Sequence, residues 1–536
     1  MIALILLAVV AVGTIYVWRR EACLNAPWVP DDETNKFTQT PLPPPSERNS
    51  ILQRKLPLRT RGRYIVDSAG DRFQLLSVNW YGASDELFVP GGLEVRHRDD
   101  IARTIRRLGF NSVRLPYADE LVVRNPVISA ELVAANPDLA GLRALDVLEA
   151  VVAALTGAGL AVVVNNHITR ATWCCGADPC DAGWANDHLG GLCAVRQTEE
   201  GWIRNWEEVM GRFRGDPLVV GVDLRNEVRG LWGTMPWRSW AEAAERCADR
   251  LLAMNPGWLV VVEGTESAND LSGARARPVR LSVPDRVVYS AHVYAWSGWG
   301  SWGGRFAQRR YGSFVKEMRK SWLWMLEEEV APVWVGELGA GREPSRGAER
   351  YWRNLWRLLK TVDADFGYWA VNPRKVANGT VETYSLLEED WETPVLDYRM
   401  KDMVGRIFQL AIRYGILTLP RPAVVLWARS VVAYPTLPTT GIYDSVRISE
   451  GTKLVALLRR VYPKVEHGPG VWWPRVVAGV AVADGEAEDR DFVDRCLLEI
   501  WQHPLAEHGP LLGLQKLRRL WRSGRTGGRT DEPVPC

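Results

Sequence analysis

The chain has 536 residues, too many for one small hydrophobic core, so we expect one large domain with additional segments. Charged residues make up 24% and hydrophobic residues 47%, which excludes a mostly disordered, a collagen-like or a multi-pass membrane protein. Lys plus Arg number 66 and Asp plus Glu number 64, so the net charge of +2 gives no reason to expect a nucleic-acid partner.

The N-terminal part consists of an apolar run and a proline-rich stretch. Residues 2–18 are almost wholly apolar and precede Arg19 and Arg20, so residues 1–20 fit either a signal peptide or a membrane anchor. The expected location is therefore extracellular after secretion, or a membrane to which the N-terminal segment anchors the protein. Residues 21–57 are rich in proline and polar residues and lack an apolar period, which predicts an extended linker.

Residues 58–405 show short apolar runs that alternate with helical patterns. The predicted helices are 100–108, 142–155, 202–213, 240–254, 314–329 and 349–361. The predicted strands are 75–79, 112–115, 161–165, 219–223, 259–262, 287–291, 333–336 and 368–371. This alternation predicts an α/β fold, a (β/α)8 TIM barrel. A doubly wound open sheet is the alternative, but no Gly-x-Gly-x-x-Gly follows the first strand to bind a dinucleotide.

Residues 406–536 have a different texture, and helical patterns near 452–461, 490–501 and 513–521 predict a mainly helical C-terminal region. Three of its motifs, Trp472-Trp-Pro-Arg, Asp489-Arg-Asp and Leu517-Arg-Arg-Leu-Trp521, loosely resemble the C-terminal helical segment of fungal zinc-cluster transcription regulators. No six-cysteine zinc cluster accompanies them, so we do not expect DNA binding. The role of this region stays open.

Four of the eight cysteines are close together in what the pattern indicates is one loop, namely Cys174, Cys175, Cys180 and Cys193. Behind a secretory leader, such a cluster favours one or two disulfides, and the sequence does not fix their pairing. A zinc site is the alternative, but adjacent cysteines do not have the Cys-x2-Cys spacing of a tetrahedral site. We therefore expect no metal there.

Functional side chains of a TIM barrel lie where the strands end. Polar or aromatic residues close the predicted strands or lie next to their ends: Arg114, His167, Asn226, Glu227, His292, Tyr294, Glu337 and Trp369. Acetal hydrolysis needs two carboxylates at one site, because one protonates the leaving oxygen while the other stays ionised. Each residue alone has a plain structural explanation, but the set predicts a catalytic site with Glu227 and Glu337 as the pair.

Residues 61–399 resemble glycoside hydrolase family 5, the cellulase family, whose members share a (β/α)8 barrel. The resemblance rests on Asp223-Leu-Arg-Asn-Glu227, His292-Val-Tyr294 and Gly336-Glu-Leu-Gly339. It implies that Glu227 is the acid/base, that Glu337 is the nucleophile of a double displacement, and that Asn226 binds the sugar 2-hydroxyl. No metal ion or organic cofactor is implied.

The same resemblance implies the roles of the remaining residues. Arg114 orients the nucleophile and keeps it ionised, while His292 and Tyr294 line the cleavage subsite. His167 belongs to the wall of that subsite, and Trp369 is the platform beneath the sugar at the point of cleavage. Trp296 follows the His292-Val-Tyr294 motif in a glycine-rich stretch and is the best candidate for a further sugar-stacking ring.

The resulting prediction is a retaining β-glycosidase that acts on a polysaccharide or oligosaccharide, most simply a β-glucan, in the manner of an endoglucanase. Mannan and β-1,3-glucan are alternative substrates, because one constellation serves several of them. A catalytically silent sugar-binding barrel is the alternative from another class. We expect the protein to be a monomer.

Overall fold

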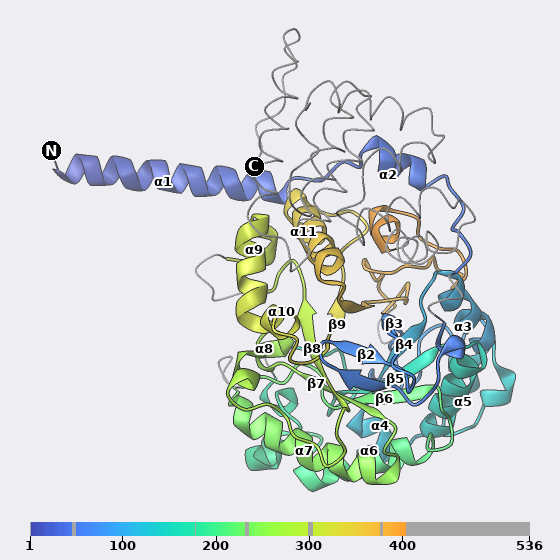
Figure 1. The fold of residues 1–536 in the computed structure, drawn as a ribbon. Coiled ribbons are helices and arrows are strands. Elements are labelled where there is room, and N and C mark those ends of the chain that lie inside the picture. Colours follow the sequence, from blue (N-terminus) through green and yellow to red (C-terminus); the bar gives the residue numbers. More distant parts are fainter. Residues whose placement is uncertain are drawn as a thin grey trace, which may run out of the picture. The chain divides into compact units, whose positions relative to one another are not determined.

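A computed structural model describes residues 2–45, 50–176, 178–230, 235–298, 304–375 and 379–403. Parallel strands close into an eight-stranded barrel in the order β10-β3-β4-β5-β6-β7-β8-β9. Figure 1 shows them inside a ring of helices, which confirms the predicted (β/α)8 barrel. The strands are β3 (Leu76–Asn79), β4 (Ser112–Ala118), β5 (Ala161–Ile168), β6 (Val219–Asp223), β7 (Leu259–Glu263), β8 (Val287–Val293), β9 (Val333–Leu338) and β10 (Asp365–Tyr368).

The helices begin and end within a few residues of the predicted patterns. The longer ones around the barrel are α3 (Arg98–Arg107), α5 (Ala144–Gly157), α6 (Glu199–Gly211), α7 (Trp237–Met254) and α11 (Arg346–Val362). The predicted helix 314–329 consists of α9 (Tyr311–Met318), a π-helical turn η10 (Arg319–Leu323) and α10 (Trp324–Glu327). The connecting segments contain the short helices α4 (Asp119–Arg124), α8 (Thr265–Ala268), η3 (Ala130–Val133), η4 (Pro137–Leu139), η5 (Pro179–Asp181), η6 (Asp187–Leu192), η8 (Ser272–Arg275) and η9 (Phe306–Gln308).

The last strand lies earlier than predicted. β10 ends at Tyr368, so Trp369 follows the strand instead of belonging to it, and the prediction of a strand over 368–371 is wrong. Ala370 and Val371 are fully buried, and the backbone N–H of Val371 donates to the carbonyl of Asn79. Their apolar character therefore reflects burial of the segment after the strand, which sequence periodicity alone does not distinguish from a strand.

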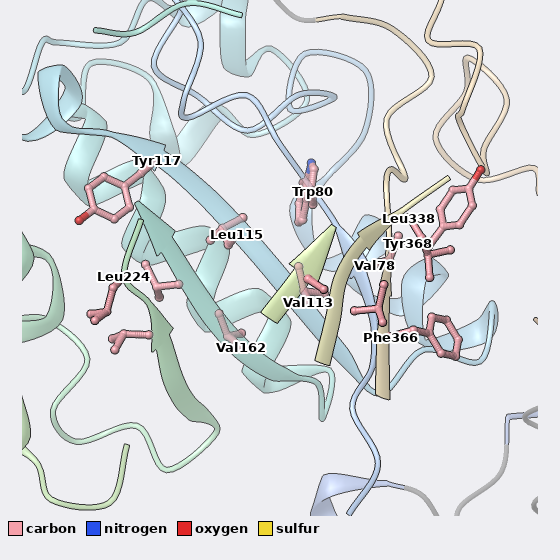
Figure 2. Packing of buried hydrophobic residues seen from close by; sticks show 14 of the residues in the cluster. Val78, Trp80, Val113, Leu115, Tyr117, Val162, Leu224, Leu338, Phe366 and Tyr368 are labelled. Atoms are coloured by element: carbon pink, nitrogen blue, oxygen red, sulfur yellow. The ribbon is translucent and has the colours of Figure 1, made fainter. Parts of the chain in front are cut away.

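Alternation along the strands divides the core into two layers. In β5, Val162 and Val164 pack outward in the cluster that includes the helices, whereas Ala161 and Val163 pack inside the barrel. Figure 2 shows outward-facing strand residues such as Val113, Val162 and Phe366 within that cluster. The same two-residue period carries the inward row of β5 on to Asn165 and His167, and this directs polar side chains to the carboxyl end of the barrel.

A short antiparallel hairpin precedes the barrel. It pairs β1 (Arg59–Arg61) with β2 (Tyr64–Val66). Ile65 is fully buried, and it packs with Phe73 and Leu75 in the cluster that fills the barrel interior. Burial of these apolar side chains attaches the hairpin to the barrel.

The N-terminal segments differ from the predicted extended linker. Helix α1 spans Ile2–Asn25 and so continues past residue 20, and a second helix, α2 (Asp32–Phe37), begins at the N-cap Asp31. A one-turn helix, η2 (Ile51–Gln53), follows, and Leu24 and Ile51 are almost completely buried. Side-chain capping and burial of single apolar residues thus create order where no apolar period exists.

Membrane attachment was one expectation for the N-terminus. Among the described residues, no helix is long and apolar enough to cross a membrane. The predicted helical region 406–536 lies outside the described residues.

Candidate active site

Arg114 gathers the polar groups at the carboxyl ends of several strands. It alternates in β4 with Val113 and Leu115, which face the helices, so its side chain points into the barrel. The fully buried guanidinium donates hydrogen bonds to Glu337 Oε1 at 2.6 Å, Asp223 Oδ2 at 2.7 Å, Asn226 Oδ1 at 2.8 Å, Glu263 Oε1 at 2.9 Å and Asn79 Oδ1 at 3.0 Å. A buried cation is tolerated only when it is paired in this way.

The two predicted catalytic carboxylates lie side by side. One carboxylate oxygen of Glu227 and one of Glu337 lie within 4.8 Å of each other and of a ring nitrogen of His292. His292 Nδ1 is 3.0 Å from Glu227 Oε1, and the Tyr294 hydroxyl donates to Glu337 Oε2 at 2.8 Å. Retaining glycosidases separate their carboxyl groups by about 5–5.5 Å and inverting ones by about 6.5–9.5 Å. The spacing therefore suits attack by a carboxylate.

Glu263, at the end of β7, is a third buried carboxylate that sequence reasoning missed. Its Oε1 accepts from Arg114, and its Oε2 accepts from the backbone N–H of Glu227 at 2.7 Å. Glu227 has φ +49°, a left-handed conformation that residues other than glycine rarely adopt. Glu263 thus holds the backbone of Glu227 in an unfavourable conformation that directs its side chain to His292. Glu263 directly follows an apolar run, so the strand-end rule could have identified it.

Burial and neighbouring charges shift the protonation equilibria of this cluster. Burial, together with the charges of Glu337 and Glu263, raises the pKa of Glu227 above its usual value, although His292 opposes the shift. Burial also favours the neutral form of Glu263, but His292, Arg114 and the N–H of Glu227 outweigh it and hold its pKa at about 2. These shifts favour the protonated form of Glu227 and the ionised form of Glu263.

The carboxylates around His292 favour its charged form. Burial alone would lower its pKa, but the nearby Glu263 and Glu337 carboxylates outweigh burial and raise the pKa well above its usual value. Glu227, His292 and Glu337 have the spacing of metal ligands. A protonated imidazole cannot bind a metal ion, so these atoms are suited to proton transfer and hydrogen bonding.

Aromatic rings surround the carboxylates. Trp369 stacks on Tyr81, with ring centroids 5.0 Å apart, and on His167 at 5.4 Å. Trp296 stacks on Tyr294 at 4.9 Å, and its side chain is 50% exposed. The structure thus brings the nine predicted catalytic and sugar-binding residues to one end of the barrel, with Trp296 at the exposed margin.

Two disulfides lie in the loop after β5. Cys174 pairs with its neighbour Cys175, and Cys180 pairs with Cys193. None of the four sulfur atoms is therefore a thiolate that could bind zinc. The amide nitrogen of Asn226 lies 3.4 Å from the sulfur of Cys175 and 3.8 Å from that of Cys174.

A closed (β/α)8 barrel with two carboxylates at this spacing, on different strand ends, has the catalytic arrangement of a retaining glycoside hydrolase. Comparison of the sequence with protein families agrees, because residues 66–375 match cellulase, glycosyl hydrolase family 5. This match covers more than half of the chain, and the chain therefore belongs to glycosyl hydrolase family 5. Membership in this family makes it a glycoside hydrolase, an enzyme that hydrolyses O-glycosidic bonds.

Curated relatives and solved structures agree with this family. An endoglucanase of Paenibacillus polymyxa is 29% identical over an alignment of 372 residues, and the match covers 65% of this chain and 86% of that protein. The major extracellular endoglucanase of Xanthomonas campestris pv. campestris is 28% identical over an alignment of 349 residues, and the match covers 61% of this chain and 67% of that protein. The solved catalytic domain of the latter has a TM-score of 0.54 and 25% identity, and the match covers 65% of this chain and 99% of that domain.

A structure of an endocellulase from Pyrococcus horikoshii in complex with cellotetraose is also similar. Its TM-score is 0.54 and its identity 25%, and the match covers 66% of this chain and 100% of that one.

Proposed function

We propose that this chain is an endo-acting β-1,4-glucanase in which Glu227 is the acid/base and Glu337 the nucleophile. The observation that carries the proposal is the distance of at most 4.8 Å between one carboxylate oxygen of Glu227 and one of Glu337, which is nearer to the spacing of retaining than of inverting enzymes. The endoglucanase and endocellulase names of the relatives support a β-glucan substrate and internal cleavage.

The proposed reaction has two steps. Glu337 attacks the anomeric carbon while the proton held by Glu227 passes to the leaving oxygen, and a covalent glycosyl-enzyme forms. Glu227, now ionised, removes a proton from water, and that water displaces Glu337. Arg114 and Tyr294 each donate to one oxygen of Glu337, so they fix the orientation of the attacking carboxylate.

The remaining predicted residues form the proposed sugar subsites. Asn226 binds the 2-hydroxyl at the point of cleavage, and His292 and His167 line that subsite. Trp369, which stacks on Tyr81 and His167, is the proposed platform beneath that sugar. Trp296 offers a half-exposed ring for a neighbouring sugar.

The test is hydrolysis of soluble β-1,4-glucan, mixed-linkage glucan, β-1,3-glucan, mannan and aryl β-glycosides by the full chain, with product anomers followed by NMR. We expect the fastest turnover on β-1,4-glucan, short oligosaccharides as early products, and the β-anomer as the first product. A preference for mannan or β-1,3-glucan would reject the proposed substrate. Absence of hydrolysis by folded protein would instead indicate a sugar-binding barrel.

We further propose that the protein acts outside the cell as a monomer, with residues 58–405 as its catalytic domain and residues 1–20 as a leader or anchor. The two disulfides support an oxidising compartment, and one relative is an extracellular endoglucanase. In cultures of cells that express the full-length gene, we expect the protein in the medium or on the cell surface. N-terminal sequencing and light scattering of that material test the proposal. Recovery of the protein only from the cytosol, with free thiols, would contradict it.

A further inference from the structure

The disulfide between Cys174 and Cys175 joins neighbouring residues in the loop after β5. In an extended chain, neighbouring side chains point to opposite sides, whereas this bond brings both sulfur atoms to one side. Cys175 has φ +72°, a left-handed conformation that residues other than glycine rarely adopt. Such a conformation persists only where the surroundings hold it, and it often marks a functional site.

The two sulfur atoms contact the side-chain amide of Asn226, which is almost fully buried. The amide nitrogen donates towards Cys175 Sγ at 3.4 Å and Cys174 Sγ at 3.8 Å, while its oxygen accepts from Arg114 Nη2 at 2.8 Å. A guanidinium only donates and disulfide sulfurs only accept, so together they fix which end of the amide is nitrogen. Sulfur is a weak acceptor, which leaves the amide N–H groups available to a substrate oxygen.

The loop holds the disulfide firmly against Asn226. On one side of the pair, the backbone N–H of Ala171 donates to Glu120 Oε2 at 2.9 Å. On the other side, Arg229 Nη2 donates to the carbonyl of Gly176 at 3.0 Å. Cys174 also packs against the buried apolar cluster that contains Ala171. The disulfide is therefore held by hydrogen bonds of the chain before and after it, and by packing of Cys174 against the apolar cluster.

We propose that the Cys174–Cys175 disulfide is a positioning element of the active site, which orients the Asn226 amide towards the 2-hydroxyl of the sugar at the point of cleavage. The proposal rests on the function proposed above, because it assumes that role of Asn226. Without the disulfide, the amide keeps its bond to Arg114 but loses its contacts on the nitrogen side. Arg114 still fixes the oxygen end of the amide, but the nitrogen end can then shift away from the position in which its N–H faces the substrate.

The experiment compares the full chain with the variant Cys174→Ala/Cys175→Ala on a pair of aryl β-cellobiosides, with and without the 2-hydroxyl on the sugar attached to the aryl group. We expect kcat for the substrate with the hydroxyl to fall about tenfold, the effect of losing one hydrogen bond. For the 2-deoxy substrate, kcat should change less than twofold. In an Asn226→Ala background, the same cysteine substitutions should cost little on either substrate, since the group they position is gone.

The matched control is Cys180→Ala/Cys193→Ala, which removes the other disulfide of the loop but none of the contacts to Asn226. We expect it to lower the melting temperature while the ratio of the two substrates stays at its original value. Equal losses on both substrates for the Cys174→Ala/Cys175→Ala variant, or additive losses with Asn226→Ala, would overturn the positioning role.

Failure of the proposed function has a different signature, because the unmodified chain would then hydrolyse neither cellobioside. If the chain hydrolyses neither cellobioside, a crystal structure of the Cys174→Ala/Cys175→Ala variant still tests whether the disulfide orients Asn226, because it needs no substrate. We expect the Asn226 amide to occupy more than one orientation while Glu227 and Glu337 keep their positions. An unchanged, single orientation of Asn226 would reject the inference.

Discussion

Replacement of Glu337 by alanine is expected to abolish turnover of β-glucan, with kcat lowered on the order of 10⁵-fold, because the covalent step loses its nucleophile. Azide should partly restore cleavage of aryl β-glycosides, since the space left by the carboxylate admits a small anion beside Arg114. The product should be the α-glycosyl azide, because a single displacement inverts the anomeric centre. Release of the aryl group and the anomeric proton signal in NMR measure both effects.

The matched control for this variant is Glu388→Ala, which removes a half-exposed carboxylate that pairs with Arg342 outside the site. We expect its activity to match that of the unmodified chain, since exposed ion pairs contribute little. We expect the Glu337→Ala variant to fold, because Arg114 keeps its ion pairs with Asp223 and Glu263. Thermal unfolding tests whether the variant is folded. A β-configured azide product, or substantial activity without azide, would reject Glu337 as the nucleophile.

Replacement of Glu227 by glutamine is expected to lower kcat on polysaccharide by about 10²–10⁴-fold, the usual contribution of a general acid. An aryl glycoside with a good leaving group should keep a fast first step, because its departure needs no proton. The glycosyl-enzyme should then accumulate, because no base activates water for the second step. A burst of released aryl group followed by slow turnover is the measurement.

The pH profile distinguishes this role from a merely structural one. The unmodified chain needs Glu227 protonated, and burial raises its pKa, so activity should persist to a higher pH than an ordinary carboxyl allows and then fall. In Glu227→Gln, that fall on the basic side should disappear for substrates with good leaving groups. The same basic limb in both proteins would assign it to another group and contradict the role of Glu227.

Much of the fold follows from local patterns that survive in the structure. Continuous apolar runs such as residues 259–262 are barrel strands, because a strand buried on both faces must be apolar throughout. The last strand was predicted too late in the sequence because Ala370 and Val371 are apolar and buried, as strand residues are, but lie after the end of β10. Periodicity reports burial, and only hydrogen bonding to a neighbouring strand defines β structure.

The candidate site was predictable because strand ends converge in a closed barrel. Arg114, Glu227 and Glu337 are separated by more than a hundred residues at each step. Glu227 follows the end of β6 and Glu337 lies one residue before the end of β9, whereas Arg114 lies within β4. Arg114 reaches Glu337 and Asn226 because its side chain faces the barrel interior. Glu263 escaped notice because a single glutamate after an apolar run is common at a protein surface. Its contacts with Arg114 and with the backbone of Glu227 give it a role, and those contacts exist only in the folded barrel.

The sequence by itself determined the barrel, the carboxylate pair and the family resemblance, because strand burial and strand-end chemistry leave local patterns of residue type. Only the tertiary structure decided the pairing of the four loop cysteines, the stacking of Trp369 on Tyr81 and the contact between Asn226 and the Cys174–Cys175 disulfide. These features depend on where loops from different strands meet. They require residues that are far apart in the sequence to be close in space, and residue type alone does not determine which residues are close.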